Sequence, residues 1–135
     1  MYAELQCKTN FSFLRGASDA NEYIRRAVEL GISSVAITDV NGVYALPRAF
    51  EALKENPQIK LISGCELAIA DHASITLLAR DRAAYGIMCR TITTAHAGKE
   101  KGKAHLTLPE FLMLMSKKEA KGLVSFCPAS DQVNV

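Results

Sequence analysis

Four polar residues follow the first three stretches of the chain that have a strand-like pattern. Gln6 and Lys8 end the first stretch, Asp39 ends the second and Glu66 ends the third. Because ligands of α/β proteins bind at the carboxyl ends of parallel strands, these side chains could converge on one site. Carboxylate oxygens are competent metal ligands, whereas a glutamine amide is a poor donor and a lysine adds positive charge. Polar residues also follow strands simply because the chain turns into solvent there, and the pattern leaves both interpretations open.

Familiar nucleotide-binding and hydrolytic motifs are missing. No G-x-G-x-x-G follows a predicted strand, and no G-x-S-x-G elbow for a serine nucleophile occurs. The run from Gly98 to Lys103 resembles a phosphate-binding loop, but it is one residue too short and ends in Ala104, which has no hydroxyl for magnesium.

The remaining polar residues have structural interpretations beside functional ones. His72 and His96 fit no ligand spacing, and we expect both to be structural. Cys127 has no matched histidine and carboxylate, so a core thiol is expected there. Six lysines could follow a DNA backbone or could simply be solvated, and no aromatic residues are interleaved with them in the sequence to stack bases. These lysines are Lys99, Lys101, Lys103, Lys117, Lys118 and Lys121.

Hydrophobic periodicity predicts the elements that would position these residues. Strands are expected at residues 2–6, 34–38, 60–66, 74–79 and 122–127. Four helices are expected between them, in the order β-α-β-α-β-β-α-α-β. This alternation predicts an α/β fold with mainly parallel strands flanked by helices, as either an open doubly wound sheet or a segment of a β/α barrel.

Capping signals predict where the helices begin and end. The expected starts are Ser18 as the first N-cap, Pro47 in the first turn of the second helix, Asp81 as the third N-cap and a Thr107–Glu110 capping box. The expected ends are Gly31, Asn56-Pro57 and Gly98, where the chain leaves the first, second and third helices.

Composition limits the class of protein. The chain has 135 residues, of which 49% are hydrophobic and 22% charged, with a net charge of +2. Residues 1–135 are therefore expected to form a single domain, and the composition excludes a disordered chain. The first residues do not resemble a secretory signal and no apolar run is long enough to span a bilayer, so we expect a cytoplasmic protein with no membrane partner. Its four cysteines are then expected to be free, buried thiols.

Five segments resemble the opening of the PHP (polymerase and histidinol phosphatase) domain of bacterial C-family DNA polymerase III alpha subunits. The resemblance is nearest to the error-prone, DnaE-like type, and the segments occur in the family's order. They are residues 2–18 (YAELQCKTNFSFLRGAS), 36–44 (AITDVNGVY), 62–67 (ISGCEL), 77–85 (LLARDRAAY) and 106–108 (LTL). The resemblance implies about the first half or more of a distorted PHP-type β/α barrel. It also implies a DNA replication, repair or translesion-synthesis context.

The family's usual metal site is altered at several of the matching positions. PHP domains bind two or three divalent ions such as zinc or manganese, and hydrolyse phosphoesters or act as proofreading nucleases. Gln6 and Lys8 stand where the family has His-x-His, and Arg15 stands where an acidic residue is frequent. Val40 replaces the histidine of an Asp-His pair, so only Asp39 and Glu66 keep the usual residue types.

These replacements predict a vestigial rim with no bound cofactor. Each cation about 5 Å from a dication would cost roughly 6–7 kcal/mol at an effective dielectric constant near 20. Lys8 could instead pair with Glu66 or Asp39 and replace the charge of the metal.

The resemblance therefore suggests a structural segment, with two alternatives. An active metal-dependent phosphoesterase or exonuclease is one, and a stand-alone α/β interaction module is the other. The expected partners are the remainder of a polymerase alpha subunit, DNA through that parent protein, or a second copy bound at an open sheet edge. Nucleotidyl transfer would require a palm domain that these residues do not include.

Overall fold

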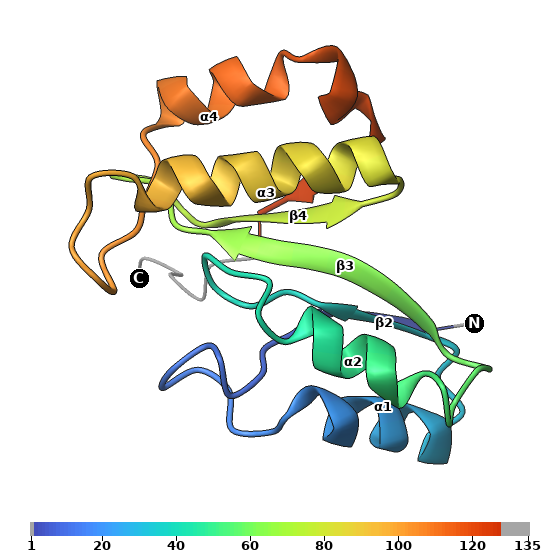
Figure 1. The fold of residues 1–135 in the computed structure, drawn as a ribbon. Helices are drawn as coiled ribbons and strands as arrows, with labels where there is room; N and C mark the ends of the chain where they lie inside the picture. The colour runs from blue at the N-terminus through green and yellow to red at the C-terminus, as the bar shows by residue number, and fades with distance from the viewer. Residues whose placement is uncertain (1, 128–135) are drawn as a thin grey trace, which may run out of the picture.

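The computed structural model describes residues 2–127, which form a five-stranded sheet covered by helices (Figure 1). The elements are, in chain order, β1 (Ala3–Cys7), α1 (Ala20–Glu29), β2 (Ser34–Ile37), α2 (Leu46–Ala52), β3 (Lys60–Leu67), β4 (Ile75–Ala79), α3 (Arg82–His96), α4 (Leu108–Met115), a 3-10 turn η1 (Lys118–Gly122) and β5 (Leu123–Phe126). Apart from the short η1 turn, this is the order predicted from periodicity.

The strands lie side by side in their chain order, β1-β2-β3-β4-β5. The β1–β2 and β2–β3 pairs are parallel, while β4 is antiparallel to both β3 and β5. Four of the five strands therefore run in one direction, which confirms the prediction of mainly parallel strands. Strand β4 is reversed because it follows β3 directly, without a crossover helix.

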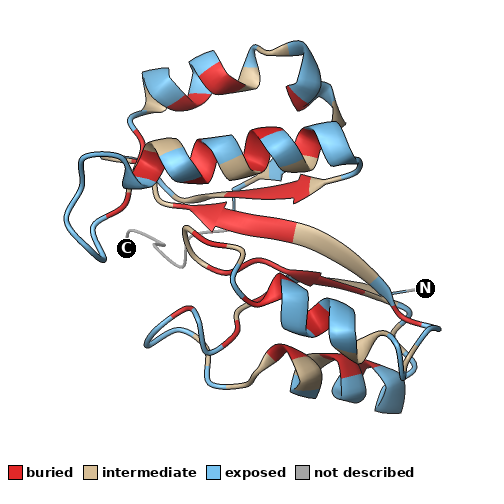
Figure 2. Ribbon diagram, viewed as in Figure 1, coloured by how far each residue is buried: buried red, intermediate tan, exposed pale blue. Residues whose placement is uncertain are grey.

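All four helices pack on the same face of the sheet. Alternate residues of β3 show this, because Leu61 packs with α1 and α2 whereas Cys65 and Leu67 pack with α3 and α4. Since side chains of a strand alternate between faces, these three residues share one face. Figure 2 shows the buried positions on the strands and on the sides of the helices that face them. This one-sided arrangement agrees with a barrel segment and not with a doubly wound sheet, in which helices cover both faces.

The opposite face of the sheet carries the candidate site. Gly64 lies there with almost no free space, since an added Cβ would come within 2.7 Å of Thr38 and 2.8 Å of Leu78. Glu66, two residues further along β3, points to the same face at the carboxyl end of the strand.

Most of the predicted helix boundaries are confirmed. Asp81 caps α3 by accepting a hydrogen bond from the Ala84 N–H (2.8 Å), and Thr107 and Glu110 form the predicted capping box. Gly31 and Gly98 leave their helices with φ of +67° and +68°. Asn56 closes α2 through its side chain, which donates to the carbonyl of Ala52 (2.9 Å).

Ser18 was the wrong N-cap. The cap of α1 is Asp19, whose carboxylate accepts from the Glu22 N–H (3.0 Å) while the Glu22 carboxylate accepts from the Asp19 N–H (2.9 Å). This reciprocal pair needs an acidic or amide side chain three residues after the cap, and Glu22 is three residues after Asp19.

The cysteines are free but not all buried. Cys7 and Cys65 lie in the core, and burial raises the pKa of each thiol to about 12. Cys89 is half-buried and Cys127 is exposed, so the expectation of a core thiol at Cys127 was wrong. Cys127 lies directly after the β4–β5 ladder, whose last pair is Thr76 with Phe126, at an edge of the sheet formed by residues 2–127.

None of the helices within residues 2–127 combines the length and the apolar character needed to cross a bilayer.

Candidate functional site

A buried carboxylate between two cations is the central feature of the candidate site. Glu66 at the end of β3 is only 2% exposed. Lys8 Nζ lies 3.0 Å from one of its carboxylate oxygens and Arg15 Nη1 lies 2.8 Å from the other. Lys8 also donates to the Thr38 hydroxyl (3.0 Å), so its ammonium group is held between β2 and β3.

The two cations keep Glu66 ionised. Burial by itself would raise the pKa of this carboxyl group. The hydrogen bonds and positive charges of Lys8 and Arg15 outweigh burial and hold the pKa below its usual value. The lowered pKa keeps Glu66 ionised at neutral pH, whereas a general acid must carry a proton.

Asp39 at the end of β2 is also buried, and the loop that follows β1 occupies its oxygens. Its Oδ1 accepts from the Thr9 N–H (2.7 Å) and the Ser12 hydroxyl (2.5 Å), and its Oδ2 accepts from the Thr9 hydroxyl (2.7 Å). The Ser12 hydroxyl oxygen in turn accepts from the Val40 N–H (3.0 Å). Asp39 therefore fixes the conformation of the loop.

The structure brings five of the six predicted rim residues together. Lys8 and Arg15 contact Glu66, and the backbones of Asp39 and Val40 run beside it, with the Glu66 N–H donating to the Asp39 carbonyl (3.0 Å). Of the two pairings considered for Lys8, the one with Glu66 is formed. Gln6 is exposed and lines a hollow together with Lys8 and Arg15, so it lies near the two cations but is not part of the contacts around Glu66.

The donor set present does not fit a divalent metal ion. Within residues 2–127 no group of three or more histidine, cysteine, aspartate or glutamate side chains is close enough to hold one. The oxygens of Glu66 and Asp39 already accept hydrogen bonds from five protein groups. An added dication would also lie beside the Lys8 ammonium and the Arg15 guanidinium.

Sequence reasoning missed four residues that organise the rim. Thr9, Ser12 and Thr38 supply hydroxyls to the network, and their only signal in the sequence was their position beside the predicted strand ends. Asn41 adopts φ of +50°, accepts from the Ala68 N–H (3.0 Å) and donates to the Ala104 carbonyl (2.8 Å). Asparagine tolerates this left-handed conformation, which was a usable signal.

The two histidines that were expected to be structural lie outside the rim contacts. His96 bonds through Nε2 to the Asn41 carbonyl (2.8 Å), and His72 is exposed in the turn between β3 and β4.

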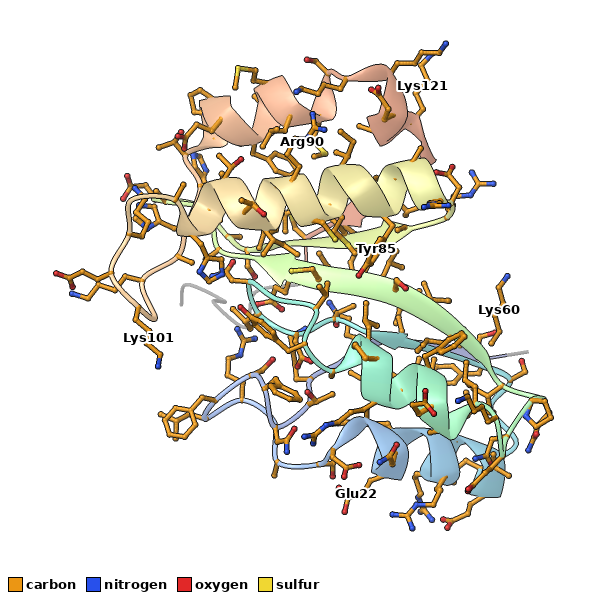
Figure 3. All side chains as sticks on the ribbon, viewed as in Figure 1. Glu22, Lys60, Tyr85, Arg90, Lys101 and Lys121 are labelled. Carbon is orange, nitrogen blue, oxygen red and sulfur yellow. The ribbon has the colours of Figure 1, made fainter. Side chains whose placement is uncertain are left out.

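The six lysines do not form one track. Lys101 and Lys121 lie at opposite ends of the molecule in Figure 3, with Lys101 in the loop after α3 and Lys121 in η1.

The chain belongs to the PHP domain family, since residues 4–131 match that family. The fold and the rim agree with this assignment: a one-sided β/α sheet whose polar residues gather at the carboxyl ends of β1, β2 and β3.

Similar proteins carry the name error-prone DNA polymerase. The chain is 43% identical over 106 residues to error-prone DNA polymerase 1 of Agrobacterium fabrum, covering 78% of this chain and 10% of that protein. It is 47% identical over 103 residues to the enzyme of Anaeromyxobacter sp. strain K, covering 73% and 9%. The match to the Rhodopirellula baltica enzyme is 37% identical and covers 97% of this chain and 11% of the relative. The chain therefore spans about a tenth of the length of these relatives.

Solved structures share the fold. An amidohydrolase from Chromobacterium violaceum, with bound sulfate and no metal, aligns with a TM-score of 0.57 at 23% identity, over 73% of this chain and 34% of that one. A protein from Bifidobacterium adolescentis described as a metal-dependent phosphoesterase aligns with a TM-score of 0.56 at 23% identity, over 70% and 32%.

Proposed function

We propose that this chain is a non-catalytic PHP segment that supports an error-prone DNA polymerase alpha-like protein, in which paired cations replace the metal ions of the site. The observation that carries the proposal is the buried Glu66 carboxylate, with Lys8 Nζ at 3.0 Å and Arg15 Nη1 at 2.8 Å. Names of relatives support the polymerase context, and the charges at the rim support the structural role.

The proposed role follows from what the cations do for the fold. A buried carboxylate needs compensation by charge and hydrogen bonds, which a metal ion can supply in an intact site. Here Lys8, directly after β1, and Arg15 in the same loop supply it, and these contacts join the loop to β3. The proposed rim therefore keeps the shape of a PHP site without its phosphoester chemistry.

Metal titration tests this proposal. Isothermal titration of the 135-residue chain with Mn²⁺ or Zn²⁺ is expected to give no stoichiometric binding at the rim. A variant that restores the family pattern, Gln6→His with Lys8→His, Arg15→Glu and Val40→His, is expected to gain Mn²⁺ affinity. Matched replacements of two exposed lysines outside the rim, Lys60→His and Lys54→His, should gain none.

Two results would contradict the proposal. The first is stoichiometric binding of Mn²⁺ by the wild-type chain that disappears in Glu66→Ala. The second is Mn²⁺-dependent turnover of a chromogenic phosphodiester that the same substitution abolishes, which would establish the phosphoesterase alternative.

The polymerase context and a cytoplasmic location are parts of the same proposal. The polymerase context has its own test. We expect the coding sequence to continue beyond Val135 into polymerase palm and fingers domains, which would make the rest of the alpha subunit the principal partner and bring DNA through it. If the chain is instead an independent module, light scattering should detect a tight dimer joined at an open edge of the sheet, β1 or β5.

A further inference from the structure

A cluster of exposed aromatic side chains lies beside the rim and is not explained by the metal-free site. Phe11 is 42% exposed, Phe13 85% and Tyr44 61%. The Phe11 and Tyr44 rings lie with centroids 6.0 Å apart at an interplanar angle of 34°. Leu14, beside Phe13, is 90% exposed. The three aromatic side chains border one hollow, and an exposed apolar patch of this kind commonly marks a binding site.

The loop that carries these side chains is held in a defined conformation. Its backbone N–H groups bond within the loop, with Ser12 donating to Thr9 (2.9 Å) and Arg15 donating to Ser12 (2.9 Å). The Asp39 carboxylate accepts hydrogen bonds from the Thr9 and Ser12 hydroxyls of the loop. Gly16 lets the end of the loop pack against its beginning, because a Cβ at Gly16 would collide with the carbonyl oxygens of Lys8 and Thr9. The rings are therefore presented on an ordered support, which lowers the entropic cost of binding.

A loop from a distant part of the chain lies across a hollow from these rings. A hollow of about 240 Å³ is bordered by Phe11, Phe13 and Tyr44 on one side and by His96, Gly102 and Ala104 on the other. Within the described residues, none that border this hollow is acidic. The loop after α3 that closes it carries Lys99, Lys101 and Lys103, all exposed.

Two further cations lie among the rings themselves. The Arg48 guanidinium carbon sits 5.4 Å from the centroid of Phe11, and Arg15 borders the same hollow while it pairs with Glu66. The loop that carries the three lysines also contains one acidic residue, Glu100. Its carboxylate oxygen lies 3.3 Å from Lys103 Nζ and offsets part of the positive charge of the loop. Lys99 and Lys101 remain on the same loop.

We propose that this surface, formed by Phe11, Phe13, Tyr44, Arg48 and the 99–103 loop, binds single-stranded nucleic acid. The aromatic rings would stack on bases and the lysines would neutralise the phosphates, the combination by which proteins bind single strands without reading their sequence. Lysines and rings are far apart in the sequence, which is why their spacing gave no such signal. The inference goes beyond the structural role proposed above, which requires no nucleic acid contact by these residues.

An apolar protein surface is the competing occupant, and charge distinguishes the two. A hydrophobic protein partner would be expected to meet an uncharged border around the rings. This border carries cations from two separate loops and from α2, which complements a polyanion.

Fluorescence anisotropy of the full 135-residue chain with labelled oligo(dT) of about 12 nucleotides tests the proposal at about 50 mM salt. We expect measurable binding that Phe13→Ala weakens about tenfold, because a stacking platform is lost. Phe50→Ala is the matched control, since Phe50 is 62% exposed on α2 but does not border the hollow. It should leave the affinity unchanged.

Charge is tested with a second pair of variants. Lys101→Glu should weaken binding and reduce its salt dependence, whereas Lys60→Glu at the opposite end of β3 should have a much smaller effect. A duplex of the same length should bind more weakly than the single strand, because its bases are not free to stack. Circular dichroism of each variant should match that of the wild type.

Three results would overturn the proposal. One is no binding of the single strand at low salt, and another is equal affinity of Phe13→Ala and Phe50→Ala. The third is concentration-dependent dimerisation that Phe13→Ala abolishes, which would assign the surface to a second copy of the chain. None of these results bears on metal binding at Glu66, so the two proposals succeed or fail separately.

Discussion

The two halves of the sheet bury polar side chains in different ways. We call one the rim half, made of β1, β2, the end of β3 and the loop after β1, and the other the helical half, made of β4, β5, α3 and α4. Five buried polar residues lie in the rim half: Thr9, Ser12, Thr38, Asp39 and Glu66. The helical half buries Thr76 and Thr91, of which Thr91 bonds only within its own helix, to the Ile87 carbonyl (2.8 Å).

The difference shows what the polar residues of the rim accomplish. In the rim half each buried polar group joins segments about 30 or 50 residues apart, such as Thr9 with Asp39 and Arg15 with Glu66. In the helical half apolar side chains from four elements form the core, and hydrogen bonds between side chains are not needed to position them. In the structural role proposed above, residue types that a PHP site could use for catalysis hold loops in place.

The largest effect is expected from Asp39→Ala. Removing the carboxylate leaves the Thr9 N–H and the Thr9 and Ser12 hydroxyls buried without their acceptor, so the free energy of unfolding should fall by about 3–5 kcal/mol. Urea denaturation measures this change. Thr91→Val, at a buried polar residue of the helical half, should cost less than about 1 kcal/mol. Equal losses in the two variants would remove the distinction between the halves.

Lys8→Met should have the next largest effect. It leaves Glu66 buried with Arg15 as its remaining cation, and the free energy of unfolding should fall by about 2–3 kcal/mol. Lys54→Met is the control, because the Lys54–Glu51 pair is exposed and should contribute no more than about 0.5 kcal/mol. Combining Lys8→Met with Glu66→Gln should restore part of the loss, and a double-mutant cycle with no coupling would show that the pair is unimportant.

Two threonine substitutions compare the halves directly. Thr38→Val removes the acceptor of Lys8 and should cost about 1–2 kcal/mol of unfolding free energy. Thr76→Val should be neutral or slightly stabilising, because the Thr76 hydroxyl is buried and, within the described residues, makes no hydrogen bond. Thermal denaturation of both variants tests this, and a clear loss in Thr76→Val would reveal a partner for that hydroxyl.

The smallest effect concerns pH. The folded-state pKa of Glu66 is lowered, because Lys8 and Arg15 outweigh burial, so its contribution to stability is present above the unfolded-state pKa. That contribution is lost as pH falls from the unfolded-state value through the lower folded-state value. Wild type should therefore lose more stability on acidification than Glu66→Gln, measured by urea denaturation from neutral pH downward. Parallel pH profiles would show that the cations do not stabilise the anion.

Local sequence signals predicted much of the fold. The Thr107–Glu110 capping box, the Asp81 cap and the glycines at 31 and 98 each act within one turn of a helix, so their effect could be recognised from neighbouring residues alone. Ser18 failed for a local reason, since Asp19 one residue later has the acidic partner that a capping box requires. The reversed strand β4 agrees with the absence of a predicted helix between it and β3.

The site was less predictable because its contacts are between distant segments. Strand ends identified Lys8, Asp39 and Glu66, but nothing in the sequence indicated that Thr9 and Ser12 would occupy the Asp39 oxygens. The aromatic residues at 11, 13 and 44 share a hollow with the loop after α3. These segments are brought together by the order of the strands and by the hydrogen bond from Asn41 to the Ala104 carbonyl. Such contacts depend on how the sheet is assembled, which residue spacing alone does not encode.

The order of the sheet has a consequence for how the chain acquires its structure. Each strand after β1 pairs with the strand made just before it, so within residues 2–127 each of these strands can join the sheet as soon as it has been made. During synthesis from the ribosome, assembly can therefore proceed in one direction, with each newly emerged strand adding to the open side of those already formed.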